Sequence, residues 1–156
     1  AGRDVKANFC GQRTRDTAIA TYKLAIFFAD LAGALASRQA GLYLKLAWLY
    51  REAGRQDEEA AMLDKAREYY EKAFLKEKPP FGNMTQLTLE YLIGELLRRT
   101  GRLPEALNYL GKVVGNPQAK KEKRVLEMAR EAWSAARDAR KAMLAADKTG
   151  GEQTGD

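Results

Sequence analysis

The 156-residue sequence contains no histidine and only one cysteine, Cys10. Histidine and cysteine are the usual ligands of structural zinc, and histidine is the base that most cysteine nucleophiles require. A single cysteine also excludes a disulfide within the chain. We therefore expect no metal site, no cofactor and no cysteine-dependent catalysis.

Long apolar runs are absent as well. The run that begins at Leu24 ends before Asp30, and a membrane span needs roughly 20 apolar residues. The first residues do not have the pattern of a cleavable signal peptide. These absences predict a cytoplasmic protein that does not enter a membrane.

Support for an enzyme is equally sparse. Without histidine, acid–base chemistry would need paired carboxylates or a lysine with a shifted pKa in a pocket. Glu90 and Glu95 are five residues apart on a predicted helix, so they do not share a face. The sequence therefore predicts a protein that is not an enzyme.

Helix-forming residues dominate the composition. Alanine, leucine, glutamate, lysine and arginine are abundant, and no block of alternating β-branched residues occurs. With 46% apolar residues, the length suits one cored domain. The prediction is an all-α fold with an N-terminal extension at 1–13, a helical domain at 14–148 and a polar, glycine-rich, disordered tail at 149–156.

Capping residues and apolar periodicity predict about six helices. The first, from Thr14 or Asp16 to about Ala36, is apolar nearly all round, so we expect it to be the central buried element. Ser37 is the expected cap of the second helix. The second and third helices are predicted at 37–53 and 57–78, and the fourth from Asn83 or Thr85 to about 99. The fifth is predicted at 103–115, and the sixth, a long capping helix, at 118–148.

Residues 89–117, LEYLIGELLRRTGRLPEALNYLGKVVGNP, have the spacing of one tetratricopeptide (TPR) unit, two antiparallel helices joined by a short turn. Gly94 lies in a helix interior, where glycine costs about 1 kcal/mol relative to alanine, so we expect a neighbouring helix against that backbone. Gly101 suits the left-handed position after a helix end, and Pro104 suits the first turn of the next helix. The pattern predicts a helix hairpin that stacks on others.

An earlier segment repeats this pattern. Aligning Ala47 with Gly94 also aligns Gly54 with Gly101. Aligning Ala66 with Ala106 in the second helix of each hairpin then requires a seven-residue insertion in the first hairpin. Two such hairpins in tandem, followed by a long basic helix, favour a TPR-like stack of antiparallel hairpins over a generic bundle.

Four segments carry a resemblance that covers about 13–137: AIATYKLA, AGLYLKLAWLYREAG, KAREYYEKAF and LEYLIGELLRRTGRLPEAL. In this order they resemble a bacterial family known only as a domain of unknown function. The resemblance implies TPR-like helices that follow, in full-length members, a zinc-ribbon-like segment with CPxCG-type cysteine pairs. Cys10 has no second cysteine within reach, so no zinc ligand can be transferred to this chain. The family supplies no catalytic residues either.

In stacked hairpins the first helix of each pair lines the concave face. An aromatic ring beside guanidinium groups there suits a peptide with an apolar anchor and a carboxylate. We therefore predict a non-catalytic adaptor for a protein or peptide segment with acidic groups, although Trp48 is expected to pack in the core ahead of touching a ligand. The candidate partner-binding residues are Lys45, Trp48, Arg51, Tyr91, Glu95 and Arg98.

Two alternatives stay open. The net charge of +6 could indicate a nucleic-acid-associated protein, and a solvated helix face is the competing interpretation of its basic cluster. A self-assembly module is the other alternative, with the groove filled by a second copy or by the last helix. The candidate phosphate-contacting residues are Lys120, Lys121, Lys123 and Arg124.

Overall fold

The computed structural model describes residues 14–151. In this range the secondary structure is helical, apart from one isolated bridge between Phe81 and Met84. The predicted all-α class and the six helices are confirmed. The elements are α2 (Arg15–Leu31), α3 (Ala36–Glu52), α4 (Gln56–Lys76), α5 (Gln86–Arg99), α6 (Leu103–Gly115), the short 3₁₀ helix η1 (Pro117–Lys121) and α7 (Lys123–Gly151).

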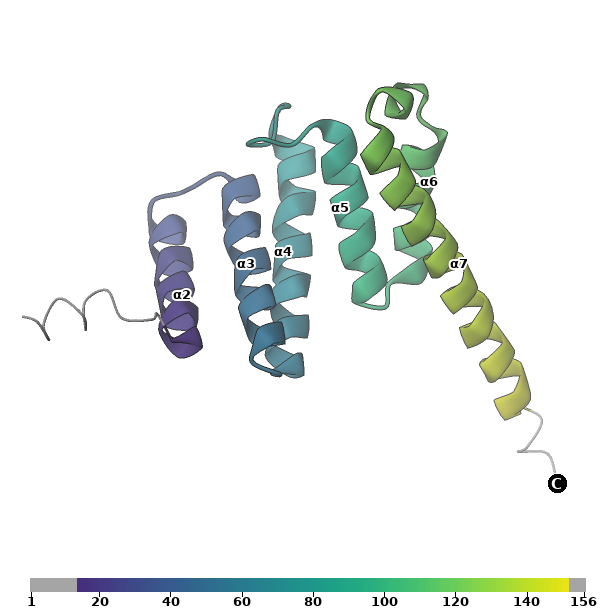
Figure 1. Ribbon diagram of the computed structural model, residues 1–156, viewed down its shortest axis with the longest axis horizontal. Helices are drawn as coiled ribbons and strands as arrows, with labels where there is room; N and C mark the ends of the chain where they lie inside the picture. Colours follow the sequence, from purple (N-terminus) through teal and green to yellow (C-terminus); the bar gives the residue numbers. More distant parts are fainter. Residues whose placement is uncertain (1–13, 152–156) are drawn as a thin grey trace, which may run out of the picture.

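The helices form a row of antiparallel neighbours (Figure 1). α3 and α4 make one hairpin, α5 and α6 make a second, and α4 contacts α5 to join the two. α2 packs on α3 at one end of the row, and α7 packs on α5 and α6 at the other. The carboxyl-terminal half of α7 projects past the other helices in Figure 1, and its residues 137–150 are exposed.

Three turns between neighbouring helices share one geometry. Gly33, Gly54 and Gly101 have φ values of 63°, 71° and 81°, which glycine adopts without the steric cost of a Cβ. After each of these glycines, the next amide donates to a carbonyl five residues back, as in the Schellman motif. The predicted roles of Gly54 and Gly101 are confirmed. Gly33 also ends the first helix at Leu31, five residues before the predicted end.

The first hairpin is longer than the second, as predicted, but the predicted place of the insertion is wrong. Leu63 and Leu110 each lie nine residues after their turn glycine, and both side chains are buried. The hairpins therefore match without a gap at the turn. The additional length of the first hairpin lies at the other end of α4, which continues to Lys76. Because alanine is frequent in this chain, the alignment matched Ala66 with Ala106, although the two residues do not hold equivalent positions in their hairpins.

Gly94 packs directly against α6. A Cβ built on Gly94 would lie 2.7 Å from Leu110 Cγ and 2.8 Å from Leu110 Cδ2. The predicted close approach of a neighbouring helix is therefore confirmed. Leu110 belongs to the main core, together with Leu89, Ile93 and Leu97, all of which are completely buried.

α2 is not the central element that its composition predicted. Ile19 is its only buried residue, because α3 covers one side of the helix and no described helix covers the other. Thr14 caps α2 as expected, by accepting a hydrogen bond from the Thr17 amide. An apolar helix thus lies at the edge of the stack formed by residues 14–151.

Two predicted helix starts also differ from the structure. Ser37 lies in the first turn of α3, and its amide and hydroxyl both donate to the Glu77 carboxylate at the end of α4, at 2.9 and 2.6 Å. The last helix begins at Lys123 because η1 precedes it, with Asn116 capping η1 through the Gln118 amide. It ends at Gly151, three residues past the predicted helical domain. The predicted N-terminal extension and the rest of the tail lie outside the described residues.

Candidate binding groove

Two neighbouring cavities lie over α5. The first, of about 360 Å³, is bounded by α3, α4 and α5. The second, of about 380 Å³, lies between α5 and α7. Tyr91 and Glu95 line both cavities, so the two adjoin across α5, and we name the pair the groove. Its remaining lining residues are Leu44, Trp48, Arg51, Leu63, Leu92, Leu96 and Arg99 in the first cavity and Arg98, Met128, Glu131, Ala132 and Ala135 in the second.

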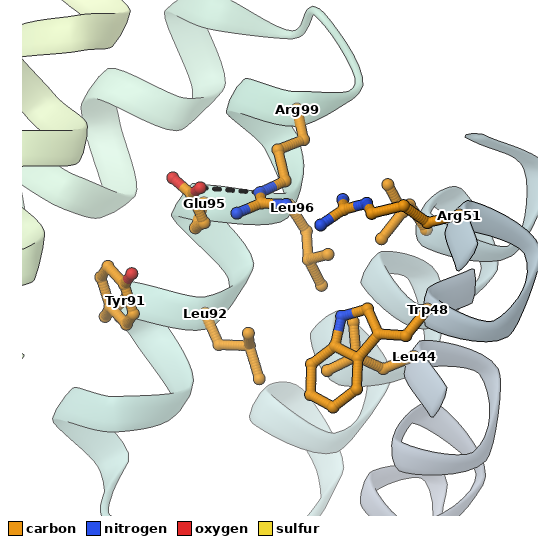
Figure 2. A pocket seen from close by; sticks show the side chains of 9 residues that line it. Leu44, Trp48, Arg51, Tyr91, Leu92, Glu95, Leu96 and Arg99 are labelled. Carbon is orange, nitrogen blue, oxygen red and sulfur yellow. Dashed lines mark hydrogen bonds and ion pairs between the residues drawn. The ribbon is translucent and has the colours of Figure 1, made fainter. Parts of the chain in front are cut away.

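Trp48 forms the apolar centre of the first cavity. Figure 2 shows its indole beside Leu44, on the side of α3 that faces Leu92 of α5. The side chain is 49% exposed, so the predicted core position of Trp48 is wrong. Most large aromatic side chains in a monomer bury more of their surface. The indole is therefore a large apolar surface that is open to solvent in this cavity.

Arg51 lies at the end of this cavity. Its Nε donates to Glu59 Oε1 of α4 at 2.6 Å, and one terminal nitrogen pairs with the same oxygen. Because both donors converge on one carboxylate oxygen, further N–H groups of Arg51 are left for another acceptor. Figure 2 shows the guanidinium groups of Arg51 and Arg99 pointing toward each other from α3 and α5.

Glu95 organises the arginines of α5. Arg98 holds its carboxylate with two hydrogen bonds of 2.8 and 2.7 Å, and Arg99 adds one of 2.8 Å. Burial raises the pKa of the Glu95 carboxyl, but the bonds from Arg98 and Arg99 outweigh this effect, so its pKa lies below the ordinary value. Burial, with a contribution from Glu95, also raises the pKa of Tyr91. The carboxylate thus fixes both arginines in place.

This pKa shift predicts a response to acid. A carboxyl whose pKa is lowered in the folded state contributes stability above its unfolded pKa, about 4.3, and that stability is lost as the pH falls through the folded pKa. We expect the free energy of unfolding to drop between pH 6 and pH 3, and to drop less in Glu95→Gln. Urea unfolding of both proteins across this range measures the difference. Parallel curves would show that Glu95 is not coupled to the fold.

The structure brings most of the predicted partner-binding residues together. Trp48, Arg51, Tyr91, Glu95 and Arg98 all line the groove. Lys45 is exposed on α3 and lines neither cavity. The contributions of α7 were not predicted, because its place beside α5 depends on packing between distant segments. Leu44 and Leu92 were also missed, although each lies four residues before another lining residue, Trp48 or Leu96.

The predicted phosphate-contacting residues lie on two elements. Lys120 and Lys121 are on η1, whereas Lys123 and Arg124 open α7, and all four are exposed. Glu122 lies between them and accepts a 2.8 Å hydrogen bond from the hydroxyl of Thr85, the cap of α5. The junction of η1 and α7 is thereby attached to the start of α5, and none of the four basic residues lines the groove.

Two findings concern metal sites and membranes. Among residues 14–151 there is no group of three or more acidic or cysteine side chains that could hold a metal ion. No helix in the same stretch is both long and apolar enough to cross a bilayer.

Comparison with known protein families gives a match over most of the chain. The model of a family described as "Uncharacterized protein conserved in bacteria (DUF2225)" matches residues 2–136. Neither a curated protein nor a solved structure matches the chain.

Proposed function

Because the chain belongs to DUF2225, a bacterial family whose description assigns no activity, we propose its function from the groove: a non-catalytic adaptor that binds a peptide or protein segment. The hairpins α3–α4 and α5–α6 fit a TPR-like arrangement, in which the first helix of each pair lines the binding face. α3 and α5 are those helices, and both line the first cavity.

The observation that supports this proposal is the half-exposed Trp48 beside two converging guanidinium groups. Interfaces derive most of their affinity from a few aromatic and arginine side chains in pockets. An apolar side chain of the partner would cover the indole, while a carboxylate would accept hydrogen bonds from Arg51 and Arg99. The ligand class is therefore a segment with a bulky apolar residue next to an acidic group or a carboxyl terminus.

Charge favours the first cavity for the acidic part of the ligand. The charged residues that line it are Arg51 and Arg99, opposed by Glu95, which leaves one positive charge in excess. The second cavity adds Glu131 and apolar side chains from α7. A bound segment would thus lie with its carboxylate between α3 and α5 and its less acidic part toward α7.

Preorganisation supports binding at low entropic cost. Arg51 is held by Glu59, and Arg98 and Arg99 are held by Glu95. Side chains that are already fixed lose less conformational freedom when a ligand docks. The groove also lies on helices and not on loops, so the backbone needs little rearrangement.

Selection from a random 12-residue peptide library on the immobilised full chain tests the proposal. We expect a consensus that contains a bulky apolar residue and an acidic residue or a free carboxyl terminus. For a selected peptide, calorimetric titration should show binding at least about 30-fold weaker for Trp48→Ala and for Arg51→Ala with Arg99→Ala, the loss typical of interface hot spots. Lys45→Ala is the matched control, because Lys45 is exposed on α3 outside the groove.

The result that contradicts the proposal is equally definite. A selection without a consensus, or peptides that bind both variants as tightly as the wild type, would show that the groove is not a peptide site. Both variants must keep the helicity of the wild type at the temperature of the titration, because Trp48 and the two arginines are at least partly exposed.

A further inference from the structure

The outer face of α2 is a stripe of large apolar side chains that no described residue covers. Leu24, Phe27, Phe28 and Leu31 are 55%, 57%, 57% and 68% exposed, and Leu35, just past the helix, is 65% exposed. Steps of three and four residues place Leu24, Phe27, Phe28 and Leu31 on one side of the helix. The basic side chain of Lys23 does not cover this face, because its Nζ lies 5.9 Å from the centroid of the Tyr50 ring on α3. We name these five residues the α2 stripe.

The stripe is unusual for the end of a helical stack. A terminal element needs a polar outer face to remain soluble. α7 fulfils this at the other end, where its exposed residues include Arg130, Arg137 and Arg140. Apolar patches on monomers rarely exceed about 300–600 Å², and larger ones mark interaction sites. The five side chains of the α2 stripe each expose more than half of their surface, so together they form an apolar patch of about this size.

A hollow lies beside the stripe. It has a volume of about 300 Å³, where the end of α2 meets the start of α3. Small side chains form most of its walls, and Phe28 belongs both to the hollow and to the stripe. The same face therefore carries protruding aromatic rings and a recess of a size that can receive one. The lining residues are Ala25, Phe28, Ala29, Ala32, Ala34, Arg38 and Leu42.

We propose that a second copy of this chain docks on the α2 stripe, with the two α2 helices antiparallel about a two-fold axis. A surface with both knobs and a recess can be complementary to itself, as a two-fold interface requires. The stripe offers on the order of 500 Å² per copy, so the pair buries about 1,000 Å² in total, which reaches the lower limit for a specific interface. In antiparallel packing the positive end of each helix dipole also lies beside the negative end of the other, which is favourable.

Dimerisation leaves the proposed groove free. No residue of the stripe lines either cavity of the groove, and α2 contacts α3 from the side away from α4 and α5 in the row of Figure 1. The pair would therefore present two grooves. The inference does not depend on what the groove binds.

Sedimentation velocity of the full chain between 1 and 100 µM tests the interface. We expect a species of twice the 17.4 kDa chain mass. Phe27→Glu with Leu31→Glu should weaken association at least 100-fold, without loss of helicity, because both side chains face solvent in the single chain. Leu75→Glu is the matched control: Leu75 is 80% exposed on α4, and its replacement should leave the dimer intact.

Cysteine crosslinking tests the geometry independently. In a Cys10→Ser background, Leu24→Cys with Leu31→Cys places two thiols seven residues apart on one helix, about 10 Å along the axis. That separation is too long for a disulfide within one chain. Mild oxidation should therefore yield a covalent dimer. A wild type that remains monomeric at 100 µM, a dimer that survives Phe27→Glu with Leu31→Glu, or absence of the crosslink would each overturn the proposal. The first result would point to another occupant of the stripe, such as residues 1–13.

Discussion

Gly94→Ala is expected to lower the free energy of unfolding by about 2 kcal/mol, although alanine is the better helix former by about 1 kcal/mol. The new methyl group would lie 2.7 and 2.8 Å from two carbons of Leu110 and 3.3 Å from its amide nitrogen. Leu110 is completely buried, so its side chain has little room to move away. Urea or thermal unfolding measures the loss.

Gly111→Ala provides the matched control for this prediction. Gly111 lies in α6 of the same hairpin, but a Cβ there would meet only Trp133, at the ordinary contact distance of 3.6 Å. The same chemical change should therefore raise stability by up to about 1 kcal/mol, through helix propensity alone. Equal effects at both positions would show that close packing at Gly94 does not govern its requirement for glycine.

A double-mutant cycle identifies the clashing partner. Leu110→Ala alone should cost about 2–5 kcal/mol through the cavity that it leaves. Combined with Gly94→Ala, the total loss should be smaller than the sum of the single losses, because the added methyl no longer meets the leucine. Additive losses would place the strain elsewhere.

Glu77→Ala is expected to destabilise the protein by about 2–3 kcal/mol, because hydrogen bonds to a charged group contribute about 1.5–3 kcal/mol and buried donors left unpaired add a further cost. Glu77 accepts from both the amide and the hydroxyl of Ser37, which is 9% exposed. The carboxylate also lies at the positive end of the α3 dipole. Chemical unfolding is again the direct measurement.

Two further variants separate these contributions. Ser37→Ala removes only the hydroxyl bond, so about 1 kcal/mol is expected. Glu127→Ala is the control for deleting a glutamate: Glu127 is exposed on α7 and makes no side-chain hydrogen bond among the described residues, so its effect should stay within about 0.5 kcal/mol. If Glu77→Ala resembles Glu127→Ala, the contact with Ser37 does not stabilise the fold.

The sequence predicted features that depend on neighbours in the chain. The turn glycines at 54 and 101 could be assigned, and Thr14 and Thr85 were each one of two candidate caps, because caps and turns involve residues within one helical turn of each other. Gly94 was informative for a related reason: its cost in an isolated helix is known, so its use there implied a compensating tertiary contact. The two hairpins followed from these local signals.

Features that depend on distant segments could not be predicted in this way. The carboxylate that caps Ser37 comes from a residue 40 positions later. The apolar character of α2 predicted burial, yet burial requires neighbours on both sides, and the stack supplies only one. In the groove, residues of α3 and α5 were predicted from the hairpin pattern, whereas Met128 and Glu131 belong to α7, whose position was set by contacts that periodicity does not encode.

The bond between Ser37 and Glu77 also bears on how the groove can move. The α3–α4 hairpin is tied at one end by the turn at Gly54 and at the other by this contact, so its two helices cannot splay apart without breaking one of them. α3 and α4 should then tilt as one rigid unit relative to α5 and α6. Trp48 and Arg51 would shift together relative to Tyr91 and Arg99, so the width of the first cavity depends on the angle between the two hairpins. A ligand that contacts both sides of the cavity would restrict this angle to a narrower range.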